Sequence, residues 1–247
     1  MCTLTLIREA DRLLVTMNRD DIAAREEAPP ALWPHVQPAF AAPKDLQAGG
    51  TWIGVNARGV IACLLNRYDE APIGAKSRGS IVLEAMRGTT VEDACDALAS
   101  LDHSFYSPFT CIIADRDSSA RIDWTGAICE RTDLPTERDV MLTSSSWHFD
   151  QVKAQREALF LKVWSKERKD ARVVAFHSAR ESADDAWAPM MQRPNSQTKS
   201  ITQVELTVRG AEMRYWTRAG AISRRLTAPD ASVQVNPGLA KLLGVSV

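Results

Sequence analysis

The chain opens with MCTLTLIREADRLLVTMNRDD, residues 1–21, and this stretch carries its most informative pattern. Residues 3–7 and 13–17 are rich in β-forming side chains, and the polar segment 8–12 separates them. Two such runs around a short polar segment predict a β-hairpin. The hairpin returns the end of its second strand, Asn18-Arg19-Asp20-Asp21, to the neighbourhood of Cys2.

Cys2 holds a position that suits a nucleophile. Methionine removal requires a small second residue, and it would leave a thiol and a free α-amine on Cys2. That amine has a pKa of about 7.7–8.0, so part of it is an unprotonated base near neutral pH. The thiol is intrinsically nucleophilic. The alternative is a cysteine that stands second in the chain by chance.

The polar end of the hairpin supplies candidate partners for Cys2. The guanidinium of Arg19 could stabilise a thiolate, and the carboxylate of Asp21 could orient the α-ammonium. The alternative is a strand end whose charges are solvated.

A second motif, GGTWIGVN at residues 49–56, is followed by LLNR at residues 64–67. Its glycines permit close approach of the backbone to a ligand. Asn66 follows an apolar strand, and its side-chain amide could donate to an oxyanion. The alternative is a hairpin whose glycines serve the turn and whose Trp52 packs in a core.

The remaining pattern predicts an α+β fold in one domain, residues 1–247. We expect an extended loop at the proline-rich residues 28–43 and helices at 80–86, 91–101, 150–166 and 238–243. Further strands are expected at residues 51–56, 60–65, 109–114, 120–124, 127–131, 140–143, 201–208 and 212–217, the last extended by 222–226. Residues 169–199 are expected to hold short helices and a loop.

The composition limits the classes of partner that we expect for this protein. With 30 basic and 31 acidic residues the net charge is -1, which gives no reason to expect nucleic acid as a partner. No segment has the roughly 20 apolar residues of a membrane span, and the charged start does not resemble a signal peptide. We therefore expect a cytoplasmic protein whose partner is a small molecule. The sequence sets no oligomeric state.

Five cysteines and four histidines show no metal-ligand spacing. Cys63, Cys95 and Cys111 lie in apolar surroundings, where a cysteine is usually a small buried hydrophobe. Neither a metal nor another cofactor is expected.

In their order and spacing, MCTL, MNRDD, GGTWIGVN, LLNR and Ser77-Arg78-Gly79 resemble the NRDE family, whose animal members are the transport-and-Golgi-organisation proteins. That family is similar to N-terminal-nucleophile (Ntn) acylases of the bile-salt hydrolase and penicillin V acylase group. The resemblance implies a four-layer αββα sandwich. It places Cys2 on the acylase nucleophile and Asp21 on the aspartate that holds the α-amine.

Several positions depart from the acylases. Asn18 stands where they have a catalytic arginine, and Arg19 is displaced by one residue, which on a regular strand faces the other side. Asp21 replaces the glutamate of the NRDE motif. Ser144, in LTSS, replaces an oxyanion asparagine.

Two functions follow from the resemblance. The first is an Ntn amidohydrolase acting on a small acyl amide with an apolar acyl group. Its catalytic residues would be Cys2, Arg19, Asp21 and Asn66, and its substrate-binding residues Asn18, Trp52, Arg67 and Ser144. The second is a non-catalytic ligand carrier on the same scaffold. Because some NRDE members are linked to haem trafficking, haem is the first ligand to test.

Overall fold

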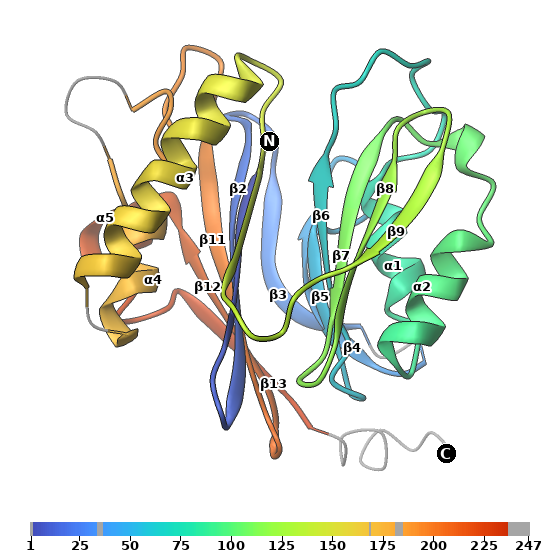
Figure 1. Ribbon diagram of the computed structural model, residues 1–247, viewed down its shortest axis with the longest axis horizontal. Helices are drawn as coiled ribbons and strands as arrows, with labels where there is room; N and C mark the ends of the chain where they lie inside the picture. The colour runs from blue at the N-terminus through green and yellow to red at the C-terminus, as the bar shows by residue number, and fades with distance from the viewer. Residues whose placement is uncertain (1, 34–36, 168, 181–184, 237–247) are drawn as a thin grey trace.

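Two antiparallel β-sheets face each other in the computed structural model, which describes residues 2–33, 37–167, 169–180 and 185–236 (Figure 1). The first sheet has the order β10 (Val140–Ser144), β1 (Cys2–Arg8), β2 (Arg12–Ile22), β11 (Ser196–Thr207), β12 (Gly210–Thr217), β13 (Ala231–Val235). The second runs in chain order through β3 (Glu27–Trp33), β4 (Phe40–Asp45), β5 (Ile53–Asn56), β6 (Ile61–Asn66), β7 (Phe109–Ala114), β8 (Ser119–Trp124), β9 (Cys129–Asp133).

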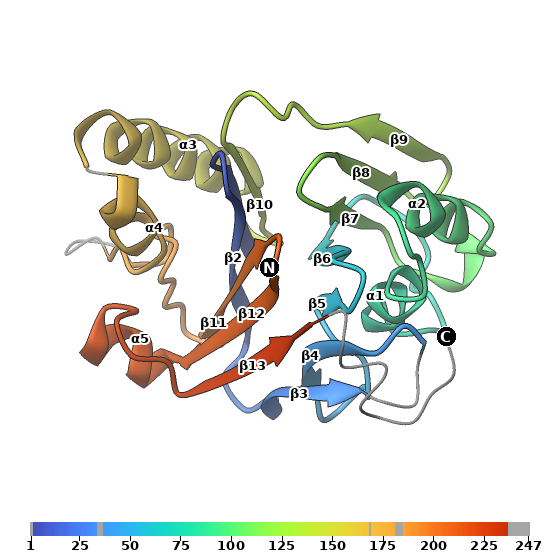
Figure 2. The ribbon, with the colours of Figure 1, turned by 90° about the horizontal axis from the view of Figure 1, so that it is seen from below.

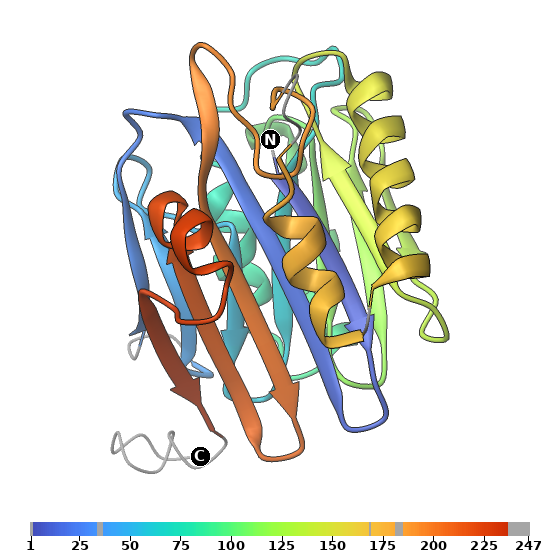
Figure 3. The same cartoon turned by 90° about the vertical axis from the view of Figure 1, so that its left-hand side faces the viewer.

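Helices cover the outer face of each sheet. The first sheet carries α3 (Phe149–Lys166), α4 (Lys169–His177) and α5 (Arg218–Arg224), as Figure 3 shows. The second carries α1 (Gly79–Ala85) and α2 (Val91–Ala99), with the short 3-10 turn His103–Phe105 after them (Figure 2). The predicted α+β class and four-layer αββα sandwich are thus confirmed.

Strand alternation builds the core between the sheets. Leu4 and Leu6 of β1 point into it, while Thr3 and Thr5 point to the helices on the outer face. A second apolar cluster lies between the other sheet and helices α1 and α2. The α2 helix begins at a capping box formed by Thr90 and Asp93, which satisfies backbone N–H groups in its first turn.

The predicted N-terminal hairpin is confirmed. Cys2 pairs directly with Arg19 of β2 on one side and with Ser144 of β10 on the other. Directly paired residues point to the same face of a sheet, so Arg19 faces the same side as Cys2 without any bend in the strand.

Two of the sequence motifs, GGTWIGVN and Ser77-Arg78-Gly79, contact each other at glycine residues. A Cβ on Gly50 would lie 2.6 Å from the backbone of Gly79, so only glycine allows this approach. The Thr51 N–H donates to the Gly79 carbonyl at 3.2 Å. GGTWIGVN and Ser77-Arg78-Gly79 therefore form one structural unit.

Two expectations about secondary structure were wrong, and one strand was missed. Residues 28–43 contain much of β3 and β4 instead of a loop; β3 is an edge strand, and its register shifts at Pro29 and Pro30, where missing N–H groups are tolerated. Residues 222–226 do not extend a strand, because Thr217 caps the helix α5 by accepting from the Gly220 N–H. The strand β13 was not predicted. The helix expected at 238–243 lies outside the described residues.

Candidate functional site

Cys2 begins β1 at one end of the sandwich and is only 6% exposed. Its backbone N–H donates to Ser144 Oγ at 3.1 Å, and its carbonyl accepts from the Thr143 hydroxyl at 3.1 Å. Burial raises the pKa of the Cys2 thiol, and the Asp20 carboxylate also raises it, while the Asp20 backbone N–H and Arg19 lower it. The thiol therefore needs a base before it can attack.

Arg19 lies in a buried cluster of carboxylates on the Cys2 side of β2. Its guanidinium contacts Glu27, Asp21 at 3.0 Å and Asp45 at 3.5 Å. It also stacks over Trp52, 4.2 Å from the ring centroid. The cation is thus compensated within the protein and fixed in one orientation.

The two neighbouring aspartates have separate surroundings. Asp21 contacts Arg19 and, at 3.5 Å, Arg25. Asp20 points to the helical side, where the Thr198 hydroxyl donates to it at 2.6 Å and Arg156 lies 3.6 Å away. Burial raises the pKa of Asp20, against the opposing effects of Arg156 and Thr198. Of the two aspartates, Asp20 is the one whose charge raises the pKa of the Cys2 thiol.

A cavity of about 500 Å³ opens beside Ser144. Asn66, at the end of β6, lines it from the opposite sheet, and β6 lies against both β1 and β10. The Asn66 side chain makes no hydrogen bond with any residue that the structure describes, so its amide is available to a ligand. The apolar lining comes from Leu65, Met141, Leu142 and Phe149.

Arg67 also lines this cavity but is held by carboxylates. It forms two hydrogen bonds of 2.8 Å with Asp69 and one of 3.1 Å with Asp123. Trp52 lies in the inter-sheet core under Arg19 and does not line the cavity. Of the predicted residues, the structure therefore brings Asn66, Arg67 and Ser144 to one cavity, and Arg19, Asp21 and Trp52 to a neighbouring buried cluster.

Asn18 is fully buried on the helical face of β2, away from the cavity. Its side-chain N–H groups donate to the carbonyls of His177 at 2.9 Å and Pro189 at 2.8 Å. The Asn18 oxygen consequently accepts from His177 Nδ1, and the Thr5 hydroxyl donates to Nε2 at 2.8 Å. The polar groups of the Asn18 side chain all form hydrogen bonds within the protein, so Asn18 has a structural role and not the predicted substrate-binding one.

This network makes stability depend on pH. Burial and, second, the charge of Arg156 lower the pKa of His177 to about 3. Below about pH 6.5, His177 binds a proton in the unfolded state but not in the folded state. The free energy of unfolding therefore falls by up to about 1.4 kcal/mol per pH unit. Urea unfolding of wild type and His177→Gln between pH 7 and 5 should show the wild-type advantage shrinking with falling pH. A difference that does not vary with pH would contradict this assignment.

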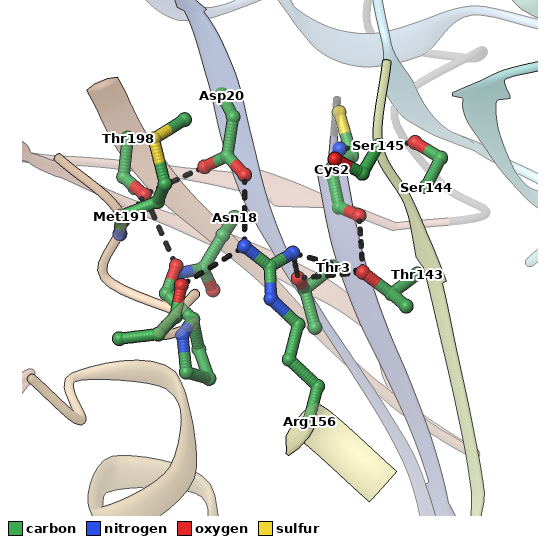
Figure 4. Close-up of polar contacts among 12 residues, drawn as sticks. Cys2, Thr3, Asn18, Asp20, Thr143, Ser144, Ser145, Arg156, Met191 and Thr198 are labelled. Carbon is green, nitrogen blue, oxygen red and sulfur yellow. Dashed lines mark hydrogen bonds and ion pairs between the residues drawn. The ribbon is translucent and has the colours of Figure 1, made fainter. Parts of the chain in front are cut away.

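Sequence analysis missed three residues near Cys2: Asp20, Thr198 and Arg156. Asp20 belongs to the quoted MNRDD motif, in which the sequence prediction assigned the catalytic role to Asp21 instead. Arg156 is buried on α3, a helix whose apolar residues give no site signal. Figure 4 shows the Arg156 side chain reaching from α3 to Asp20, Thr3 and Thr143.

The described residues contain no group of three or more His, Cys, Asp or Glu side chains placed to hold a metal ion. No helix among them is long and apolar enough to cross a membrane.

The αββα sandwich of two antiparallel sheets between helices is the Ntn-hydrolase fold. The chain is similar to conjugated bile acid hydrolase from Clostridium perfringens, with a TM-score of 0.60 and 12% identity over 100% of this chain and 95% of that one. It is also similar to the Caenorhabditis elegans ortholog of N-acylethanolamine-hydrolyzing acid amidase, with a TM-score of 0.56 and 12% identity over 82% and 92%.

Sequence comparison gives the family. The profile of Transport and Golgi organisation 2 matches residues 1–222, and the chain belongs to that family. No curated protein sequence matches it significantly.

Proposed function

We propose that this protein is an Ntn amidohydrolase that cleaves a small acyl amide with an apolar acyl group, using Cys2 after removal of Met1. The observation that carries the proposal is the pairing of Cys2 with Arg19 on one side and with Ser144 on the other, because Ser144 lines a cavity that Asn66 lines from the opposite sheet. The solved structures with this fold include enzymes named for amide and conjugate hydrolysis, which supports the reaction class.

The first chemical step uses the base that processing would create. The Cys2 α-amine takes the thiol proton while the sulfur bonds to the substrate carbonyl carbon. The carbonyl oxygen becomes an oxyanion, and the unpaired amide of Asn66 donates to it together with a backbone N–H. Because the Cys2 nitrogen already contacts Ser144 Oγ at 3.1 Å, Ser144 orients the amine in this scheme.

The second step releases the products. The carbon–nitrogen bond breaks as the protonated α-amine gives its proton to the leaving nitrogen. Water, deprotonated by the same amine, then cleaves the thioester and restores the thiol. Asp20 balances the charge of the α-ammonium from the helical side, whereas Arg19 and Asp21 form the ion-pair cluster that fixes the strand end.

The apolar part of the cavity wall supports the proposed substrate class. Leu65, Met141, Leu142 and Phe149 can contact an acyl chain. The charges at the cavity are paired, as Arg67 is with Asp69 and Asp123, so a substrate anion would compete with these carboxylates.

Intact-mass spectrometry tests the proposal directly. The purified chain should lack Met1, and brief incubation with a panel of N-acyl amides of increasing acyl length should add one acyl mass to the Cys2 peptide. The matched control is Cys2→Ala, which should gain no acyl mass. Retention of Met1 in the purified protein, or acylation that persists in Cys2→Ala, would refute the proposal.

A further inference from the structure

Arg156 is a buried cation in an otherwise ordinary helix. It is 1% exposed, and the only other residues that α3 buries are Val152 and Val163, within the described part of the chain. Burial lowers the pKa of the Arg156 guanidinium, and the nearby Asp20 carboxylate opposes that effect. A buried ion pair stabilises a fold no better than well-packed apolar side chains, so packing does not explain this arginine.

The guanidinium connects three adjacent strands of the first sheet. It donates to Thr3 Oγ1 of β1 at 2.5 Å and to Thr143 Oγ1 of β10 at 2.8 Å, and it lies 3.6 Å from Asp20 Oδ2 of β2. Its remaining donors contact the carbonyls of Trp187 at 3.0 Å and Ala188 at 2.9 Å. Lysine, with a single ammonium, cannot reproduce this forked geometry.

Each strand partner of Arg156 is the chain neighbour of a site residue. Thr3 follows Cys2, Thr143 precedes Ser144, and Asp20 follows Arg19. Neighbouring residues of a strand point to opposite faces. Arg156 therefore holds from the helical side the backbone of all three positions that surround the thiol on the other side.

We propose that Arg156 is a positioning residue, which holds the strand ends around Cys2 in place from the helical side through Thr3, Thr143 and the Asp20 carboxylate. The inference rests on the proposed role of Cys2, but it concerns the geometry and reactivity of the thiol and can be measured without substrate. In the mechanism above, its effect would be to set the distance between thiol, amine and oxyanion donor.

The experiment compares Arg156→Met, Arg156→Lys and the matched control Val152→Ala, which lies one turn earlier on the same buried face of α3. All carry Cys129→Ser, because Cys129 is the exposed cysteine among the five. The readouts are the pH dependence of iodoacetamide alkylation at the Cys2 peptide, hydrogen exchange of the peptide that holds Asp20, and melting temperature.

In Arg156→Met, Asp20 loses its cation and should bind a proton within the measured pH range. The alkylation profile should then gain a second inflection, which the double variant Arg156→Met/Asp20→Asn lacks. Exchange around Asp20 should quicken about tenfold, as expected for loss of a charge-assisted contact. Arg156→Lys should keep a single inflection, because the charge is retained, but should still exchange faster.

Val152→Ala should lower the melting temperature and leave both site readouts at wild-type values. The proposal is overturned if Arg156→Met behaves like Val152→Ala. If Arg156→Met does not fold, wild-type exchange around Asp20 in Arg156→Lys overturns it. Failure of the proposed function would give a different result. The wild type would form no acyl-enzyme, although the alkylation of Cys2 would still change in the Arg156 variants.

Discussion

Cys2→Ser is expected to lower the turnover of an amide substrate by roughly 10³-fold or more while the fold survives. The hydroxyl is smaller than the thiol and fits the same buried position, so the strand pairing with Arg19 and Ser144 should persist. Its proton is far harder to remove than that of the thiol. The same α-amine would have to take a proton from a much weaker acid, so attack by the hydroxyl should be far slower.

Steady-state kinetics on the substrate identified by acylation would measure this loss. Cys129→Ser is the matched control, because it makes the same change at an exposed cysteine on the edge strand β9. It should retain wild-type turnover. A Cys2→Ser variant within tenfold of wild type would show that hydrolysis does not pass through a Cys2 thioester.

Arg19→Met is expected to lower the free energy of unfolding by about 3–5 kcal/mol, the usual cost of removing one partner from a buried charge cluster. Arg19 is 4% exposed, and Glu27, which it contacts directly, is 7% exposed on its side chain. Without the guanidinium, Glu27 would remain buried with only the Tyr215 hydroxyl, which donates to it at 2.7 Å. Trp52 would also lose its stacked cation.

Urea unfolding curves would measure the change as a shift in midpoint at constant slope. Arg19→Lys, the matched control, keeps the charge but cannot reach Glu27, Asp21 and Asp45 together, so it should lose a smaller amount. A loss below about 1 kcal/mol in Arg19→Met, typical of exposed pairs, would contradict the buried cluster.

Elements that are specified by neighbouring residues could be predicted from the sequence alone. The alternating runs around residues 8–12 specified the hairpin, and Thr90 with Asp93 specified the start of α2. The motifs specified the family, and through it the αββα fold. These features depend on neighbouring residues, on strand periodicity and on caps, which a single sequence displays directly.

The edge strand β3 and the helix α5 were not predicted from the sequence. Pro29 and Pro30 argue against an interior strand, yet β3 lies at an edge where their missing N–H groups need no partner. Whether a segment lies at an edge is a property of the assembled sheet. The cap that makes α5 a helix includes Asp230, which receives the Thr217 N–H from 13 residues away.

Only the tertiary structure decided the arrangement around Cys2. The side chains of residues 18–21 point alternately to the two faces of the sheet. The direct pairing of Cys2 with Arg19 determines which of these side chains lie on the same face as Cys2. Arg156 is 153 positions from Thr3 and 136 from Asp20, and nothing near it in the chain marks it. Its role arises because α3 packs across three strands, and a buried charge must find its partners wherever the fold brings them.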